Sequence, residues 1–194
     1  MFSRAFSFIA FLTLFLSFSF VASNPVTIPQ AGSNAIKRQS NADIESVLND
    51  LQDQVGTILP QIDALVSGGN ATDDTVTPLI TQLTDALNAT TASLADLNTS
   101  STSTKRQSND DIANLVAGIV TDIANSLNGL LGSADSIPAL GTLLSGVDFS
   151  LNQVLVGLET LLAGVLNLVA TLLVDVAALL RSLAFGLTLA SLGL

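Results

Sequence analysis

The fold is decided by residues 41–70, which read NADIESVLNDLQDQVGTILPQIDALVSGGN. Apolar side chains recur there at alternating intervals of four and three residues, the spacing of one helical face. Acidic and amide side chains lie between them and suit the solvated face. Gly68, Gly69 and Asn70 then indicate a helix stop and a turn. The apolar positions are Ile44, Leu48, Leu51, Val55, Ile58, Ile62 and Leu65.

A second helical pattern with the same spacing follows the glycines. Two such helices joined by a Gly-rich turn predict an antiparallel hairpin over residues 39–98. Pro60 is expected to kink or divide the first helix, because it lacks the backbone N–H and clashes with the preceding turn. Thr75 or Thr77 is expected to cap the second helix, with Pro78 in its first turn. The second set of positions is Val76, Ile80, Leu83, Leu87, Thr90, Leu94 and Leu97.

The rest of the chain, residues 107–194, is far more apolar. Residues 112–131 predict another helix. Residues 149–194 are expected to continue as one long helix, with a polar stripe over somewhat under half of its circumference and a very wide apolar face. A two-helix hairpin has a thin core and needs a third helix or a second copy. The sequence therefore predicts an all-α protein, in which a helical hairpin precedes a very apolar helical region and the two combine into one loose bundle.

Three interpretations of this apolar helix remain open. It could be a transmembrane helix, for instance over 161–180, although Asp175 would be costly there. It could be a surface-active or self-assembling helix, or a buried central helix of a soluble bundle. The last two overlap, since a bundle can open at an interface. The face expected to meet an apolar surface or another copy consists of Leu166, Val169, Leu173, Leu180 and Leu187.

The first segment has the features of an export signal. Arg4 precedes an apolar run that ends in Val21-Ala22-Ser23, so residues 1–23 are predicted to be a signal peptide. A retained membrane anchor is the alternative. Asn70, Asn88 and Asn98 each begin an Asn-x-Ser/Thr sequon, which agrees with export and predicts glycans on the first half only.

Two pairs of basic residues divide the chain. The sequence has six Lys and Arg residues, and four of them form Lys37-Arg38 and Lys105-Arg106. Similar sequences follow both pairs, QSNADI at 39–44 and QSNDDI at 107–112, and each resembles a helix capping box. We expect cleavage by a kexin-type protease at both pairs, with a propeptide over 24–38 and a Ser/Thr-rich linker over 99–106.

The composition excludes much chemistry. The chain has no Cys, His, Trp or Tyr, so the common activated nucleophiles and the usual nitrogen or sulfur metal ligands are missing. A formal net charge of −10 repels nucleic-acid phosphates. The carboxylate pairs Asp73-Asp74 and Asp110-Asp111 lack the spacing of a calcium loop and suit helix starts instead. We therefore expect no catalytic residue, no cofactor, no metal and no nucleic-acid partner.

Three segments resemble a known family. They are KRQSNDDI at 105–112, NQVLVGLETLLAG at 152–164 and GLTLASLGL at 186–194. Together they are similar to the SC-fifteen family of mushroom-forming fungi, whose members are cysteine-free secreted proteins with a hydrophilic first half and a hydrophobic second half. The resemblance covers residues 39–194 and is strongest after 105.

The resemblance implies a structural protein of the cell wall or extracellular matrix, with roles in aerial hyphae and in attachment to hydrophobic surfaces. The expected partners are further copies of the chain, apolar surfaces and wall polymers. A precursor of secreted signalling or effector peptides, and a membrane-associated protein, are the alternative functions.

Overall fold

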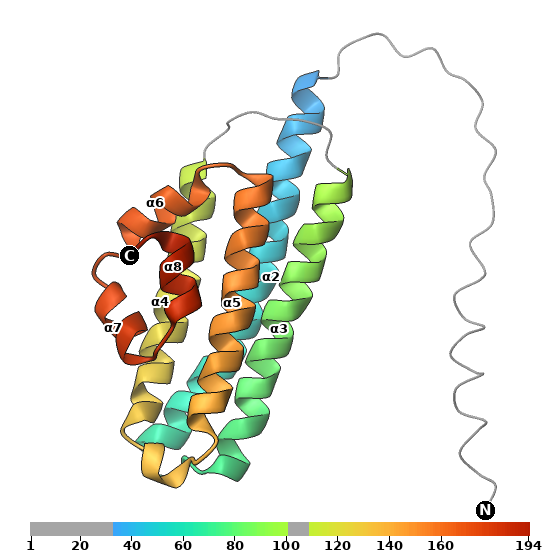
Figure 1. Cartoon of the computed structure of the whole chain (residues 1–194). Coiled ribbons are helices and arrows are strands. Elements are labelled where there is room, and N and C mark those ends of the chain that lie inside the picture. Colours follow the sequence, from blue (N-terminus) through green and yellow to red (C-terminus); the bar gives the residue numbers. More distant parts are fainter. Residues whose placement is uncertain (1–32, 101–108) are drawn as a thin grey trace, which may run out of the picture. The chain divides into compact units, whose positions relative to one another are not determined.

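The computed structural model describes residues 33–100 and 109–194, with side chains for 42–98 and 109–194. These residues form helices without any strand, which confirms the prediction of an all-α protein (Figure 1). The predicted signal peptide and the Lys105-Arg106 pair lie outside the described residues. The elements are α2 (Ser33–Ser67), α3 (Asp73–Ser100), α4 (Asn109–Leu131), the 3-10 helix η1 (Ala134–Ser136), α5 (Leu140–Leu161), α6 (Val165–Leu172), α7 (Ala177–Ser182) and α8 (Gly186–Leu192).

The helical hairpin is present as predicted, with α2 and α3 as its two helices. Every apolar position of the two predicted faces is buried except Leu65 and Leu97, which are half-buried. The polar member, Thr90, is also buried, and its hydroxyl donates to the carbonyl of Ala86 at 2.9 Å within the helix. Gly69 follows α2 with φ of +66°. Glycine adopts this left-handed conformation at little cost in free energy, because it has no side chain.

The helix starts differ from the sequence predictions. α2 begins at Ser33, so the capping box expected around Ser40 lies inside the helix. The helix also continues through Pro60 without being divided. Pro60 and the preceding turn at Gly56 are exposed, so the carbonyl that loses its intrahelical partner can be hydrated.

The start of α3 is capped by Thr72, which the sequence patterns did not predict. Thr72 precedes the helix, and its backbone N–H donates to the Thr75 hydroxyl at 2.9 Å. The Thr75 hydroxyl in turn donates to the carbonyl of Asn70 at 2.9 Å. Thr72 therefore occupies the capping position, while Thr75, one of the two predicted caps, closes the turn from within the first turn of the helix.

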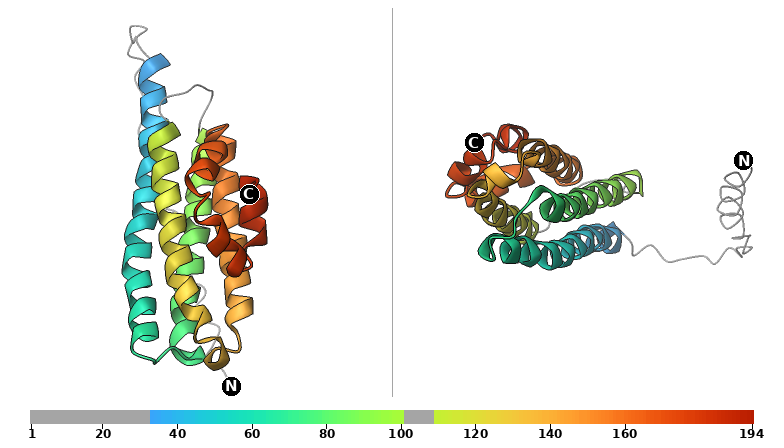
Figure 2. Two further views of the ribbon diagram at one scale, coloured as in Figure 1. Left: turned by 90° about the vertical axis from the view of Figure 1, so that its left-hand side faces the viewer. Right: turned by 90° about the horizontal axis from the view of Figure 1, so that it is seen from below.

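The long helices form a bundle that the short helices complete. α3 packs between α2 and α5, and α2 also packs on α4. α6 and α7 lie on α4, and α8 lies on α5, so the three short helices connect the α4 and α5 sides of the bundle (Figures 1 and 2). The resulting core is almost wholly aliphatic, and Phe185 is the largest of its fully buried side chains.

The expectation of one long helix over 149–194 is wrong. This segment forms the end of α5 followed by α6, α7 and α8. The chain reverses at Gly164, whose φ is +88°, and again at Ala184, whose φ is +60°. Left-handed residues of this kind end a helix, and the apolar face of the predicted helix is consequently folded inward.

Candidate functional site

The residues of the predicted interface are separated by these turns. Val169, Leu173 and Leu180 are fully buried in the bundle core. Leu166 is half-buried against the core, and only Leu187 is exposed, at 47% of its surface. The five side chains therefore do not form one outward face, and three of them can meet an outside surface only if the short helices leave the bundle.

Two carboxylates of α5, the buried Asp148 and the half-buried Glu159, accept hydrogen bonds from the starts of short helices. Asp148 is buried, and its two carboxylate oxygens accept from the backbone N–H groups of Leu187 at 3.0 Å and Thr188 at 2.9 Å. These donors belong to the first turn of α8, which lacks internal partners for them. The helix dipole also favours a negative charge at this end. Asp148 thus acts as a cap supplied from another helix.

Glu159 does the same for α6. Its carboxylate oxygens accept from the backbone N–H groups of Gly164 at 2.8 Å and Leu166 at 3.1 Å. Two polar pairs add to these contacts, since Ser191 donates to Asn152 and Ser182 donates to Asn128 at 3.4 Å. Three members of the polar stripe predicted along one long helix, Asn152, Glu159 and Ser182, therefore make contacts between different elements.

The exposed large apolar side chains are a second set of residues, and within the described part of the chain they all lie in the segment from α5 to α8. Val174 is 60% exposed and Phe149 is 54% exposed. Phe149 and Val156 are two helical turns apart and share the outer face of α5. Leu187 lies next to Phe149 along the bundle, because its N–H donates to Asp148. The full set is Phe149, Val156, Leu172, Val174 and Leu187.

Charge is divided between the same two sides of the bundle. Exposed residues 140–194 carry only Asp175 and Arg181, whose charges cancel. We call the exposed surface of residues 140–194 the neutral side, and that of α2, α3 and α4 the acidic side. In Figure 2, α5–α8 lie together at the edge of the bundle away from α2. The exposed carboxylates of the acidic side belong to Asp43, Glu45, Asp50, Asp53, Asp63, Asp74, Asp85, Asp96, Asp110, Asp111 and Asp122.

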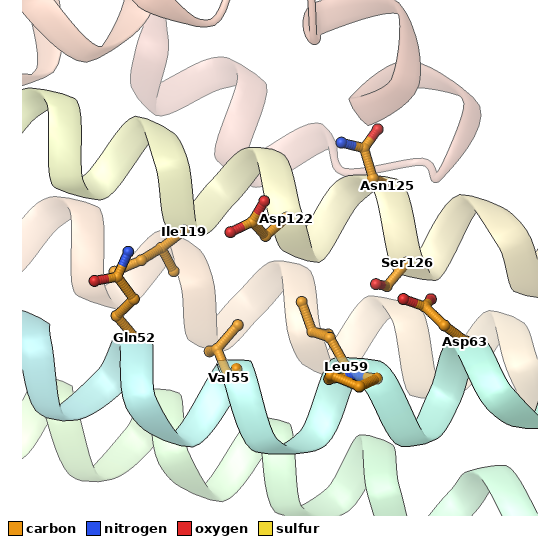
Figure 3. A pocket seen from close by; sticks show the side chains of 10 residues that line it. Gln52, Val55, Leu59, Asp63, Ile119, Asp122, Asn125 and Ser126 are labelled. Carbon is orange, nitrogen blue, oxygen red and sulfur yellow. The ribbon is translucent and has the colours of Figure 1, made fainter.

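A shallow groove of about 320 Å³ lies on the acidic side, between α2 and α4. Its floor contains Val55, Leu59 and Ile119, and Asp63 and Ser126 point toward each other across it (Figure 3). Within the described part of the chain, no three carboxylates come together in an arrangement able to hold a metal ion. The groove combines small apolar and polar surfaces, and two carboxylates, of Asp63 and Asp122, are among its lining residues.

The predicted modification sites fall on the acidic side or outside the described residues. Asn70 lies in the turn between α2 and α3, while Asn88 and Asn98 lie on α3, and all three are exposed. Asn88 also accepts a hydrogen bond from Ser150 of α5 through its side-chain oxygen, at 2.9 Å. Lys37 and Arg38 are in the first turns of α2. Cleavage and glycosylation at these positions stay predictions.

The transmembrane alternative concerned residues 161–180. This stretch is divided among the end of α5, all of α6 and part of α7. Among the helices in the described ranges, none combines the length and apolar composition required to cross a bilayer.

Of the exposed apolar residues in the second half, the sequence prediction included Leu187 but not Phe149, Val156, Leu172 or Val174. Phe149 and Val156 recur seven residues apart, but apolar residues occur on most sides of this segment, so the spacing did not single them out. The capping roles of Asp148 and Glu159 had no signal in the sequence, because their partners lie on other helices.

Comparison with known proteins gives one partial relationship. No protein-family model matches the chain. Over 66 residues the chain is 48% identical to fruiting body differentiation protein 16 of the mushroom-forming fungus Flammulina velutipes. The match covers 34% of this chain and 52% of that protein, so it spans about half the length of the curated relative. The similarity relates part of the chain to a fungal protein named for fruiting body differentiation.

Proposed function

We propose that the protein is a secreted, non-enzymatic protein of the fungal wall or matrix that attaches to apolar surfaces through its neutral side. One observation supports this most directly: among the residues with described side chains, the five exposed large apolar ones all lie in the segment from α5 to α8, where the exposed charges cancel. The acidic side, with its predicted glycans, would remain in water or in wall polymer. The partial match to a fruiting body differentiation protein agrees with a role in fungal development.

The size of the exposed apolar surface limits how strongly one molecule can attach. Complete burial of a large apolar side chain contributes about 1.5–3 kcal/mol. The five side chains are each about half exposed, so covering them gains about 4–8 kcal/mol in total. Loss of overall motion on attachment costs at least about 4 kcal/mol. A single molecule would therefore attach weakly, and firm attachment would come from many copies acting together.

Attachment through the exposed side chains does not require the bundle to unfold. The exposed side chains reach the surface from an intact bundle, whereas Val169, Leu173 and Leu180 become available only after α6–α8 leave the core. Opening would break the contacts of Asp148 and Glu159 with the helix starts. We therefore propose that attachment begins on the folded protein, with opening as a later step at the surface.

The decisive experiment measures adsorption of the secreted protein to a methyl-terminated surface with a quartz crystal microbalance. The test variant is Phe149→Asp with Leu187→Asp, which places two charges on the neutral side. The control is Gln82→Asp with Ala92→Asp, which adds the same charge at exposed positions of α3. Circular dichroism verifies that both variants retain their helices.

We expect the test variant to lose surface affinity by at least about tenfold, because two of the five apolar contacts are replaced by charges that resist dehydration. The control should bind as the parent protein does. Equal losses in both variants would mean that net charge alone governs adsorption, and unchanged binding of the test variant would refute attachment through the neutral side.

A further inference from the structure

The hairpin α2–α3 buries its apolar faces against the second half of the chain as well as against itself. α3 packs on α5 at least as extensively as on α2, and α2 packs along α4. Buried side chains from both halves belong to one hydrophobic cluster. The boundary between residues 100 and 109 therefore separates two parts of a single core.

Two glycines of the second half face side chains of the first half across this boundary, where an added Cβ atom would be in ordinary van der Waals contact. A Cβ atom on Gly157 of α5 would lie 3.6 Å from the Cδ1 atom of Leu94 on α3. A Cβ atom on Gly129 of α4 would lie 3.7 Å from the Cγ1 atom of Val66 on α2. Leu94 is fully buried, although it lies near the end of the hairpin, which places the second half against it along most of α3.

Polar contacts across the same boundary set the relative positions of the halves. The Asp73 carboxylate of α3 accepts from the backbone N–H of Ala139, which precedes α5, at 3.2 Å. Near the middle of the helices, the buried Ser150 of α5 donates to the side-chain oxygen of Asn88 at 2.9 Å. These two contacts lie at different heights along the α3–α5 pair, so together they favour one alignment of the helices.

We propose that residues up to 100 and residues from 109 are each other's binding partner, so that a chain cut between them remains one non-covalent assembly. Separation of the two halves is unfavourable, because it would expose the aliphatic core of both to water. The hairpin alone keeps only a thin two-helix core, which is too little for a stable fold of this size.

Such an assembly would change the consequence of the predicted cleavage at Lys105-Arg106. A cut there would leave the acidic, glycosylated half attached to the half that carries the neutral side. It would not release the first half as a separate peptide, which argues against the peptide-precursor function. The inference concerns the interface between the halves and does not depend on whether the neutral side attaches to surfaces.

The experiment uses the full chain with residues 101–106 replaced by the recognition sequence of a site-specific protease. After complete digestion, shown by a denaturing gel, the sample is examined by size-exclusion chromatography and native mass spectrometry. We expect one complex containing both fragments, with the helical content of the uncut protein. Thermal unfolding of the cut protein should become concentration-dependent, because two chains now separate. Fragments that elute apart at micromolar concentration would overturn the proposal.

A matched pair of glycine variants tests where the halves meet. Gly157→Leu extends a side chain from α5 toward Leu94 of α3, whereas at Gly146 of the same helix an added Cβ atom would meet nothing within 4 Å, so Gly146→Leu is the control. In the cut protein we expect Gly157→Leu to weaken association by at least about tenfold, since overpacking of this kind is destabilising. Gly146→Leu should leave association within about threefold of the parent. Equal effects of both variants would contradict the assigned interface, and a surface-binding assay on the same cut sample tests the proposed function separately.

Discussion

Asp148 offers the sharpest test of how the apolar half is held together. Its carboxylate accepts from two backbone N–H groups at the start of α8, while the residue itself is buried. Asp148→Ala removes both acceptors and keeps the backbone of α5 unchanged. The Thr188 N–H then stays buried without a partner, while the N–H of the exposed Leu187 can turn to water.

The expected loss of stability follows from these two environments. A buried hydrogen bond to a charged group contributes about 1.5–3 kcal/mol, whereas loss of a bond that water can replace costs about 0.5–1 kcal/mol. Removal of a buried carboxylate also recovers part of its dehydration cost. We therefore expect the free energy of unfolding to fall by about 2–3 kcal/mol, which lowers the melting temperature by about 4–12 °C for a protein of this size.

Urea unfolding followed by circular dichroism measures the free energy, and amide hydrogen exchange reports on α8 directly. Exchange at Leu187 and Thr188 should accelerate before that of the core of α5. Asp175→Ala is the control, since Asp175 is exposed and its removal should change stability by less than about 0.5 kcal/mol. A loss below about 0.5 kcal/mol for Asp148→Ala, or unchanged exchange in α8, would refute the capping role.

Three further changes test other parts of the packing. Thr188→Val should raise the free energy of unfolding by up to about 1 kcal/mol in urea titrations, because the buried Thr188 hydroxyl has no hydrogen-bond partner and valine has nearly the same shape; a loss would indicate a hidden partner. Ala184→Gly should raise the melting temperature, with a gain of about 1 kcal/mol, since φ is +60° there, while Gly164→Ala, at φ +88°, should lower it. Val169→Asp should abolish cooperative thermal unfolding because the side chain is fully buried, whereas Leu187→Asp should leave the transition intact; a folded Val169→Asp protein would place that residue outside the core.

The sequence by itself determined the helical class and the hairpin. In α2 and α3 the apolar residues follow a strict four-three spacing, and the glycines at 68 and 69 stop the first helix, so local information was sufficient. Even in this hairpin the helix starts differ from the predicted ones. The start of α2 at Ser33 and the cap of α3 by Thr72 depend on individual hydrogen bonds rather than on periodicity.

Only the tertiary structure decided which apolar residues face outward. Residues 149–194 are apolar on nearly every side, so periodicity gave no signal for their turns or for their buried face. The turn at Ala184 requires a conformation that alanine disfavours, and α6 and α8 begin where Glu159 and Asp148 meet them from α5. The Asp148 contact joins residues 39 positions apart in the chain, and both sets of contacts form only once the helices have packed. For that reason the buried Val169 and the exposed Phe149 could not be distinguished until the bundle was seen.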